Sequence, residues 1–160
     1  MQFDFKDALA QGVRFNSSRT GSGGYGAMEM KTTTIPALVD VLPSWLKNRL
    51  IEFSCKCTNN GNNGSVVTVT GNKLAIRSNT ELGVSYRYVE GTAIPYLTQS
   101  SDNRKRKRGH SGGNQEWWTR SPENGSWLYW CYTNASGNVS TSTSAEPQFN
   151  QYGLAPFGCL

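Results

Sequence analysis

The sequence predicts an α+β domain in which two helices pack on short, twisted antiparallel sheets joined by long loops. Three observations support this class. Only 36% of the residues are hydrophobic and 17% are charged, and this composition, rich in Gly, Asn, Ser and Thr, favours short strands and turns. Apolar residues recur at helical spacing between residues 28 and 53, and from Trp117 onward the pattern is that of strands. A length of 160 residues fits one domain.

The first stretch of the chain is set apart by the glycine-rich segment GSGGYG at residues 21–26, which predicts a flexible joint. Before it, apolar residues alternate loosely with polar ones: Phe3, Phe5, Leu9, Val13 and Phe15. We expect residues 1–19 to form either an edge strand or an arm that docks on a neighbouring subunit. Residues 20–160 are expected to form a single domain.

Two helices are predicted between residues 28 and 53. The first would bury one face and could kink or restart at Pro36 before Leu42-Pro43 ends it. That face comprises Met28, Ile35, Leu38, Val39 and Leu42. The second would begin near Ser44, whose side chain is a candidate cap. Its core-facing residues would be Trp45, Leu46, Arg49, Leu50 and Phe53.

The remaining segments predict strands separated by polar loops. Residues 54–78 suggest a strand, a Gly/Asn-rich loop and further strand pieces, whereas residues 79–98 show no regular pattern. Residues 99–114 have the composition of a loop. Asn134-Ala135-Ser136-Gly137 has hairpin-turn chemistry, with Gly137 supplying a positive φ.

The net charge of +5 is concentrated in the run Arg104-Lys105-Arg106-Lys107-Arg108. The rest of the chain is near neutral, whereas nucleic-acid binding normally spreads Lys and Arg over a face, so nucleic acid is an unfavoured partner. Clustered like charges favour a solvated loop. Attraction to an anionic glycan or a host surface is the alternative.

No pattern of catalytic or metal-binding residues is evident. The four cysteines, Cys55, Cys57, Cys131 and Cys159, include no C-x-x-C pair, and the single histidine is His110. Cys55 and Cys57 are badly placed to bridge each other, and a disulfide is allowed but not required. There is no carboxylate pair, Ser/His/Asp set or phosphate-binding glycine loop. We therefore expect no enzyme activity, no metal ligands and no cofactor.

The motif QEWWTRSP at residues 115–122 raises the question of aromatic stacking on a ligand. Adjacent strand residues point to opposite faces, so at most one of Trp117 and Trp118 can face a given ligand. At least one is then expected in the core. We interpret Trp117, Trp118, Arg120 and Pro122 as a structural element that anchors a sheet to its loops, with Arg120 either stacking on the loop that follows or hydrogen-bonding beneath it.

Residues 123–152 are the better candidate for recognition because Tyr, Trp, Asn, Ser and Gly dominate them, as in antibody paratopes. In the expected strand 127–132, Leu128, Trp130 and Tyr132 alternate with Trp127, Tyr129 and Cys131, and the sequence leaves open which set is exposed. The candidate ligand-binding residues are Asn124, Trp127, Tyr129, Tyr132, Asn134, Asn138, Gln148, Asn150 and Tyr152.

Over residues 20–160 the chain resembles a family of domains of unknown function from gut bacteria and their phages. The resemblance rests on the W-W-x-R-S-P motif at residues 117–122, an N-x-x-G turn at 134–137 and a Y-G-x-x-P segment at 152–156. It extends to the helix pair with its Leu42-Pro43 break and to a turn through Ser78, Glu81 and Gly83. Asn72-Lys73 replaces an expected Asp-Lys, and the N-terminal part is short.

The resemblance implies a C-type-lectin-like fold, in the branch shared with formylglycine-generating enzymes and retroelement-diversified phage adhesins. Cys131 and Cys159 do not match the cysteine pair on which the chemistry of those enzymes depends. Family members look like parts of phage tail or fibre proteins and of bacterial surface proteins. The resemblance therefore implies a lectin-like domain of a phage virion appendage (tail fibre, tail tip or head fibre) that binds a host-surface glycan or protein.

Two alternatives stay open: a structural virion protein, such as a capsid decoration or connector, and a bacterial surface domain. The expected partners also include other virion subunits, and the expected assembly is a homo-oligomer, with a trimer favoured. The start of the chain lacks a secretory pattern, and no apolar run reaches the length of a membrane span. We thus expect no membrane insertion, and a protein made in the bacterial cytoplasm and located in the virion.

Overall fold

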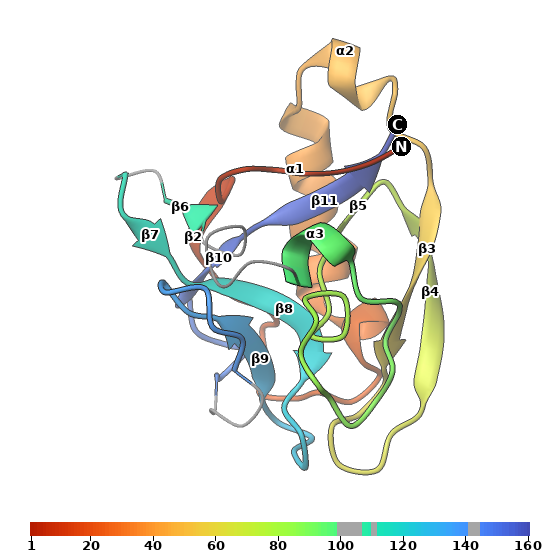
Figure 1. Ribbon diagram of the computed structural model, residues 1–160, viewed down its shortest axis with the longest axis vertical. Coiled ribbons are helices and arrows are strands. Elements are labelled where there is room, and N and C mark those ends of the chain that lie inside the picture. Colours follow the sequence, from red (N-terminus) through yellow and green to blue (C-terminus); the bar gives the residue numbers. More distant parts are fainter. Residues whose placement is uncertain (99–106, 110–111, 141–144) are drawn as a thin grey trace.

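The computed structural model, which describes residues 1–98, 107–109, 112–140 and 145–160, is a mixed α/β domain with short helices and several small, mainly antiparallel sheets (Figure 1). The first sheet has the strand order β1-β11-β5. Its members are β1 (Gln2–Asp4), β11 (Pro156–Cys159) and β5 (Leu74–Ile76). The predicted combination of helices with small antiparallel sheets is confirmed.

A second sheet has the order β2-β10-β8-β9, and its β10–β8 pair is parallel. Its members are β2 (Ala10–Val13), β10 (Tyr152–Leu154), β8 (Trp117–Pro122) and β9 (Trp130–Thr133). Two further strand pairs complete the fold. They are β3 (Phe53–Thr58) with β4 (Val66–Asn72), and β6 (Lys107–Arg108) with β7 (Asn114–Gln115). The last pair falls inside the stretch that composition alone assigns to a loop.

The helical segment between residues 25 and 47 consists of four short helices. They are η1 (Tyr25–Ala27), the π-helical η2 (Met30–Thr34), α1 (Ile35–Val41) and α2 (Ser44–Lys47). Pro36 lies in the first turn of α1, where η2 passes directly into α1 with helical backbone at Thr34 and Ile35. Leu42 is extended and ends α1, so the predicted break is confirmed. A separate one-turn helix, α3 (Pro95–Thr98), lies in the stretch that the sequence leaves irregular.

Three expectations for the second helix are wrong. The residue that caps α2 is Pro43, not Ser44, and no side chain caps the helix. Trp45 is 66% exposed and Arg49 is also exposed, whereas Leu46 and Leu50 are each 8% exposed. The reason is length: a helix of four residues turns about once, so it buries only one position per turn.

Residues 1–19 contain edge strands of the two larger sheets. β1 pairs antiparallel with β11, with Gln2 opposite Cys159, and β2 pairs with β10. Phe15, fully buried, stacks on Trp130 with a ring-centroid distance of 4.1 Å. The N-terminal amino group donates to the Leu160 carbonyl at 2.6 Å, and Figure 1 shows the two termini side by side beside α2.

Strand β8 lies between two apolar clusters, and this explains why both tryptophans of the motif are buried. Trp118 belongs to the main core and donates from Nε1 to the Val13 carbonyl at 2.7 Å. Trp117 points the other way, into a smaller cluster with Leu82 and Leu97. Both indoles are at most 1% exposed, so neither can stack on a ligand.

Candidate functional site

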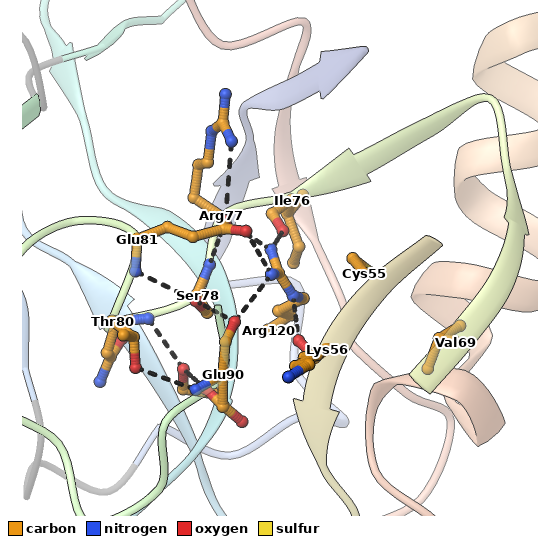
Figure 2. Close-up of polar contacts among 12 residues, drawn as sticks. Cys55, Lys56, Val69, Ile76, Arg77, Ser78, Thr80, Glu81, Glu90 and Arg120 are labelled. Atoms are coloured by element: carbon orange, nitrogen blue, oxygen red, sulfur yellow. Dashed lines mark hydrogen bonds and ion pairs between the residues drawn. The ribbon is translucent and has the colours of Figure 1, made fainter. Parts of the chain in front are cut away.

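A buried network of charged and polar side chains lies beside β8, and Arg120 is at its centre (Figure 2). The guanidinium is fully buried and donates to the carbonyl oxygens of Lys56 at 2.8 Å and Ile76 at 2.5 Å. It also contacts both carboxylate oxygens of Glu81, at 2.8 and 2.6 Å, and the carbonyl of Glu90 at 3.2 Å. Arg120 therefore holds strands β3 and β5 and the loop that follows β5, not the loop after β8.

Arg77 extends this network toward the N-terminus. Its Nε and Nη2 atoms donate to the two carboxylate oxygens of Asp4 at 2.9 and 2.7 Å. Its Nη1 lies 3.7 Å from Glu81, and its guanidinium lies over the ring of Phe157 at 3.6 Å. Glu81 thus lies between two buried arginines, and each of these three side chains has an oppositely charged partner.

Glu90 ties the other end of the same loop to β8. One carboxylate oxygen accepts from the Thr58 backbone N–H at 2.6 Å, and the other accepts from the Ser121 hydroxyl. Ser121 in turn accepts from the Asn79 backbone N–H at 2.8 Å. Burial raises the pKa of Glu90. The side chain has no exposed surface that a substrate could reach, so this acid serves the fold rather than chemistry.

The network holds a group of loops that gather at the end of the domain opposite the termini (Figure 1). We call this surface the loop end and define it as residues 17–23, 59–65, 84–89 and 122–129. Gly125 donates its N–H to the Gly61 carbonyl at 2.8 Å, and a Cβ at Gly61 would collide with the carbonyl oxygens of Glu123 and Ser126. The Arg87 guanidinium and the Tyr88 hydroxyl both donate to the Asn62 carbonyl, at 2.6 and 3.1 Å. Backbone contacts therefore fix these loops against one another.

The loop end exposes aromatic and amide side chains. Trp127 is 58% exposed, while its carbonyl accepts from the Gly21 N–H at 2.5 Å and so fixes its backbone. Tyr129 is half-buried, with the Arg19 guanidinium 4.6 Å from its ring centroid. Asn62 and Asn124 are exposed beside them. Of the sequence-predicted binding residues, Asn124, Trp127 and Tyr129 lie here.

The other predicted binding residues lie elsewhere on the second sheet and its turns. Tyr132 and Tyr152 stack with centroids 4.3 Å apart and pack, half-buried, against the main core. Asn134 accepts the backbone N–H groups of Ser136 and Asn138, both at 3.0 Å, and so shapes the predicted turn, in which Gly137 has a φ of 87°. Gln148 donates to Glu146 at 3.2 Å, and Asn150 is exposed.

The expected alternation along residues 127–132 is wrong. β9 begins only at Trp130; Trp127 and Leu128 form a bend before it, and Tyr129 is irregular. Trp130 and its neighbour Cys131 are both buried, because both faces of β9 are covered here: the first side chain packs on Phe15, and the second donates to the Pro122 carbonyl. Trp127 is exposed because it precedes the strand, not because of strand parity.

The basic run is not simply a solvated loop. Residues 104–106 lie outside the described residues, but Lys107 is 6% exposed in β6, and its amino group donates to the Phe5 carbonyl. Burial lowers the pKa of Lys107. This residue therefore attaches the β6–β7 pair to the N-terminal strand region rather than offering a cation to a ligand.

All four cysteines are free, and Cys55, Cys57 and Cys131 are buried. Burial raises the pKa of Cys57 to about 11 and that of Cys131 to about 12, so both are protonated thiols at neutral pH. Within the described ranges no cluster of His, Cys, Asp and Glu could hold a metal ion, and His110 is outside them. None of the helices that the structure describes is both long and apolar enough to cross a membrane.

A cavity of about 240 Å³ lies between α1 and the β4–β5 connection. Its apolar lining comes from Ile35, Pro36, Val39 and Leu74, and the lining also includes four charged residues. Those four are Lys31, Asp40, Glu52 and Lys73. The sequence-predicted binding residues do not line this cavity.

Sequence reasoning missed several of these residues. Arg77 and Glu90 have no local signature, because their partners Asp4 and Thr58 lie 73 and 32 residues away. Asn62 belongs to the Asn/Gly-rich stretch 59–64, whose composition indicates a turn but does not indicate a binding surface. Glu81 belongs to the turn motif on which the family resemblance partly rests, and that motif was the one sequence feature that pointed to this residue.

Fold and site together define a single mixed α/β domain whose buried ion-pair network supports a group of fixed, polar and aromatic loops. The chain belongs to the family described as Domain of unknown function (DUF6273), whose model matches residues 15–157. Neither a curated protein nor a solved structure matches the chain.

Proposed function

We propose that this domain is a C-type-lectin-like recognition module of a bacteriophage virion appendage, which binds a host-surface glycan or protein through the loop end. The observation that carries the proposal is Trp127, an indole exposed over 58% of its surface on a backbone that neighbouring loops hold in place. A rigid aromatic ring offers apolar contact area at a low cost in conformational entropy. Glycans present apolar C–H faces and hydroxyl groups together, which suits a ring bordered by amides.

The polar groups around Trp127 support the same proposal. Asn62, Asn124 and the Arg87 guanidinium provide donors and acceptors within one group of loops. The termini lie at the opposite end, an arrangement that suits a module held at one end and exposed at the other (Figure 1). The appendage assignment, the virion location and the favoured trimer rest on the sequence resemblance and remain part of the proposal.

The experiment is binding of the purified protein to host cells and to a glycan array, comparing the wild type with Trp127→Ala. Trp45→Ala is the matched control, because Trp45 is similarly exposed, at 66%, but lies in α2 at the end of the termini. We expect Trp127→Ala to abolish binding and Trp45→Ala to retain it. Equal binding by all three proteins would overturn the assignment to the loop end.

One observation favours the alternative of a structural virion protein, such as a capsid decoration or connector. Val41, Trp45 and Ile51 are exposed over 78%, 66% and 57% of their surfaces in and just after α1 and α2. Exposed apolar residues that are close in the chain are typical of subunit contacts. Under this alternative the wild type binds neither cells nor glycans, and Trp45→Ala, rather than Trp127→Ala, weakens assembly. For a bacterial surface domain, the third alternative, the loop end would bind in the same way.

A further inference from the structure

Strand β4 (Val66–Asn72) has one free hydrogen-bonding edge. With seven residues it is the longest strand in the described part of the chain, and there it pairs with β3 only. Figure 1 shows the broad part of β4 beside β3 at the outer side of the molecule, before the chain turns inward to β5.

The register identifies the backbone groups at this edge. Asn59 donates its N–H to the Ser65 carbonyl at 3.1 Å, and the Ser65 N–H returns to the Asn59 side chain at 2.8 Å, so Ser65 faces β3. Backbone direction alternates along a strand, so Val67 also faces β3, opposite Cys57. Val66 and Thr68 therefore direct their N–H and C=O groups away from β3. Their side chains are exposed, whereas Val67 and Val69 pack against the core.

This edge lacks the features with which soluble proteins normally block strand pairing. Between Val66 and Thr70 there is no charged residue and no proline, and the register shifts only beyond Val69. The edge strands β1 and β2 have three and four residues, and β1 carries Asp4. β4 is long, β-branched and uncharged, which is the composition that favours addition of another strand.

We propose that this edge pairs with β4 of a second copy of the chain, antiparallel across a two-fold axis at Thr68. The segment VVTVT is suited to face itself: Thr68 lies opposite Thr68 of the second copy, Val67 opposite Val69, and Val66 opposite Thr70. A two-fold contact requires each residue near the axis to tolerate its own copy, and like charges there would repel. The nearest charge on the outer face is Lys56, which lies opposite Thr68 on β3, one strand away from the edge.

The pairing would exchange two backbone hydrogen bonds between the two Thr68 residues and join β3 and β4 of both copies into one four-stranded sheet. It is independent of the proposed ligand and of the loop end. It also differs from the trimer expected from the sequence, because a two-fold contact closes with two copies.

The test is sedimentation velocity of the whole chain over a range of concentrations, with a charge swap at the axis. The Thr68 N–H does not bond to β3, so Thr68→Lys and Thr68→Glu keep the backbone hydrogen bonds of the β3–β4 pair. Lys56, opposite residue 68 in the same chain, repels the new lysine and attracts the new glutamate. We expect a concentration-dependent dimer for the wild type and a dimer dissociation constant raised about fivefold or more in each variant at low salt. An equimolar mixture of the two variants restores the dimer, because opposite charges then meet at the axis.

Ser54→Lys is the matched control, since Ser54 is exposed on β3, one strand from the edge, and it should dimerise like the wild type. Circular dichroism verifies that all variants fold. A wild type that stays monomeric at its solubility limit would overturn the proposal. So would oligomers that persist unchanged in both charged variants, since the contact would then lie elsewhere.

Discussion

Arg120 and Glu81 form a two-pronged ion pair inside the domain, with Nη1 2.8 Å from Oε2 and Nη2 2.6 Å from Oε1. Burial opposes the charge of Arg120, but the nearby Glu81 carboxylate outweighs it, so the pKa of Arg120 is raised and the guanidinium stays charged. The pair joins β8 to the loop after β5, 39 residues earlier in the chain. The position of that loop therefore depends on a charge that the sequence places in the middle of a fully buried strand.

Replacing Arg120 by methionine should destabilise the fold by about 3–5 kcal/mol, because Glu81 and several carbonyl groups would lose their buried partner. Urea denaturation measures this loss. Arg14→Met is the control: Arg14 pairs with Glu29 at 2.8 Å but is 47% exposed, and its loss should cost no more than about 1 kcal/mol. Similar losses of unfolding free energy in the two variants would show that the buried ion pair stabilises the fold no more than the exposed one.

Glu90 should make the stability of the domain fall as the pH rises. The folded state raises its pKa, so above about pH 4.3 the unfolded chain releases the proton while the folded protein retains it. The contribution of this group is complete below the ordinary glutamate pKa and is lost as the pH rises through the folded value. Urea denaturation between pH 4 and pH 8 follows this change.

Glu90→Gln cannot ionise, so its stability relative to the wild type should increase with pH over that window. Glu52→Gln removes one negative charge at an exposed position and controls for net charge. Parallel stability curves for the wild type and Glu90→Gln would contradict the prediction.

Gly61→Ala should loosen the loop end, since the added Cβ meets the carbonyl oxygens of Glu123 and Ser126, which are backbone atoms. We expect a loss of about 1–3 kcal/mol in the free energy of unfolding, with weaker ligand binding if Trp127 is part of the site. Gly113→Ala is the control because nothing lies within 4 Å of its Cβ position. If Gly61→Ala were as stable as Gly113→Ala, the contact between loops 59–65 and 122–129 would have to be loose enough to admit a methyl group.

Truncation to alanine should destabilise the fold to very different extents at two adjacent residues of α2. Leu46 is 8% exposed, so Leu46→Ala should cost about 2 kcal/mol or more. Trp45→Ala should stay within about 0.5 kcal/mol, despite the larger side chain, because Trp45 is 66% exposed. Thermal unfolding of the two variants distinguishes them, and a larger loss at Trp45 would place that indole in the core.

The sequence predicts those features that local chemistry determines. Leu42-Pro43 ends a helix because proline restricts the residue before it, and Gly137 allows its turn because it lacks a Cβ. The strand character after Trp117 also follows from local pattern. Burial of both Trp117 and Trp118 did not follow, since it requires apolar clusters on both faces of β8.

The candidate site was predictable only in part, because its geometry depends on contacts between distant segments. Trp127 was named from composition, but its exposure depends on β9 beginning at Trp130. Lys107 was expected in solvent, yet it bonds to Phe5, 102 residues away. Tyr132 and Tyr152 have the side-chain chemistry of a binding surface, and the fold uses them as a stacked pair against the core.

The adjacency of the two termini determines how the domain would respond to a pulling force. β1 and β11 are antiparallel with their free ends together, and Met1 bonds to Leu160. A tension applied between the two ends would load the β1–β11 hydrogen bonds one after another, as a zipper opens, and not all at once. The first sheet would then open at low force. The same tension transmitted through a single end would still enter the first sheet, through β1 or β11, but it would not pull the ends of these two strands apart from each other. The mechanical strength of the domain therefore depends on whether one end or both are anchored.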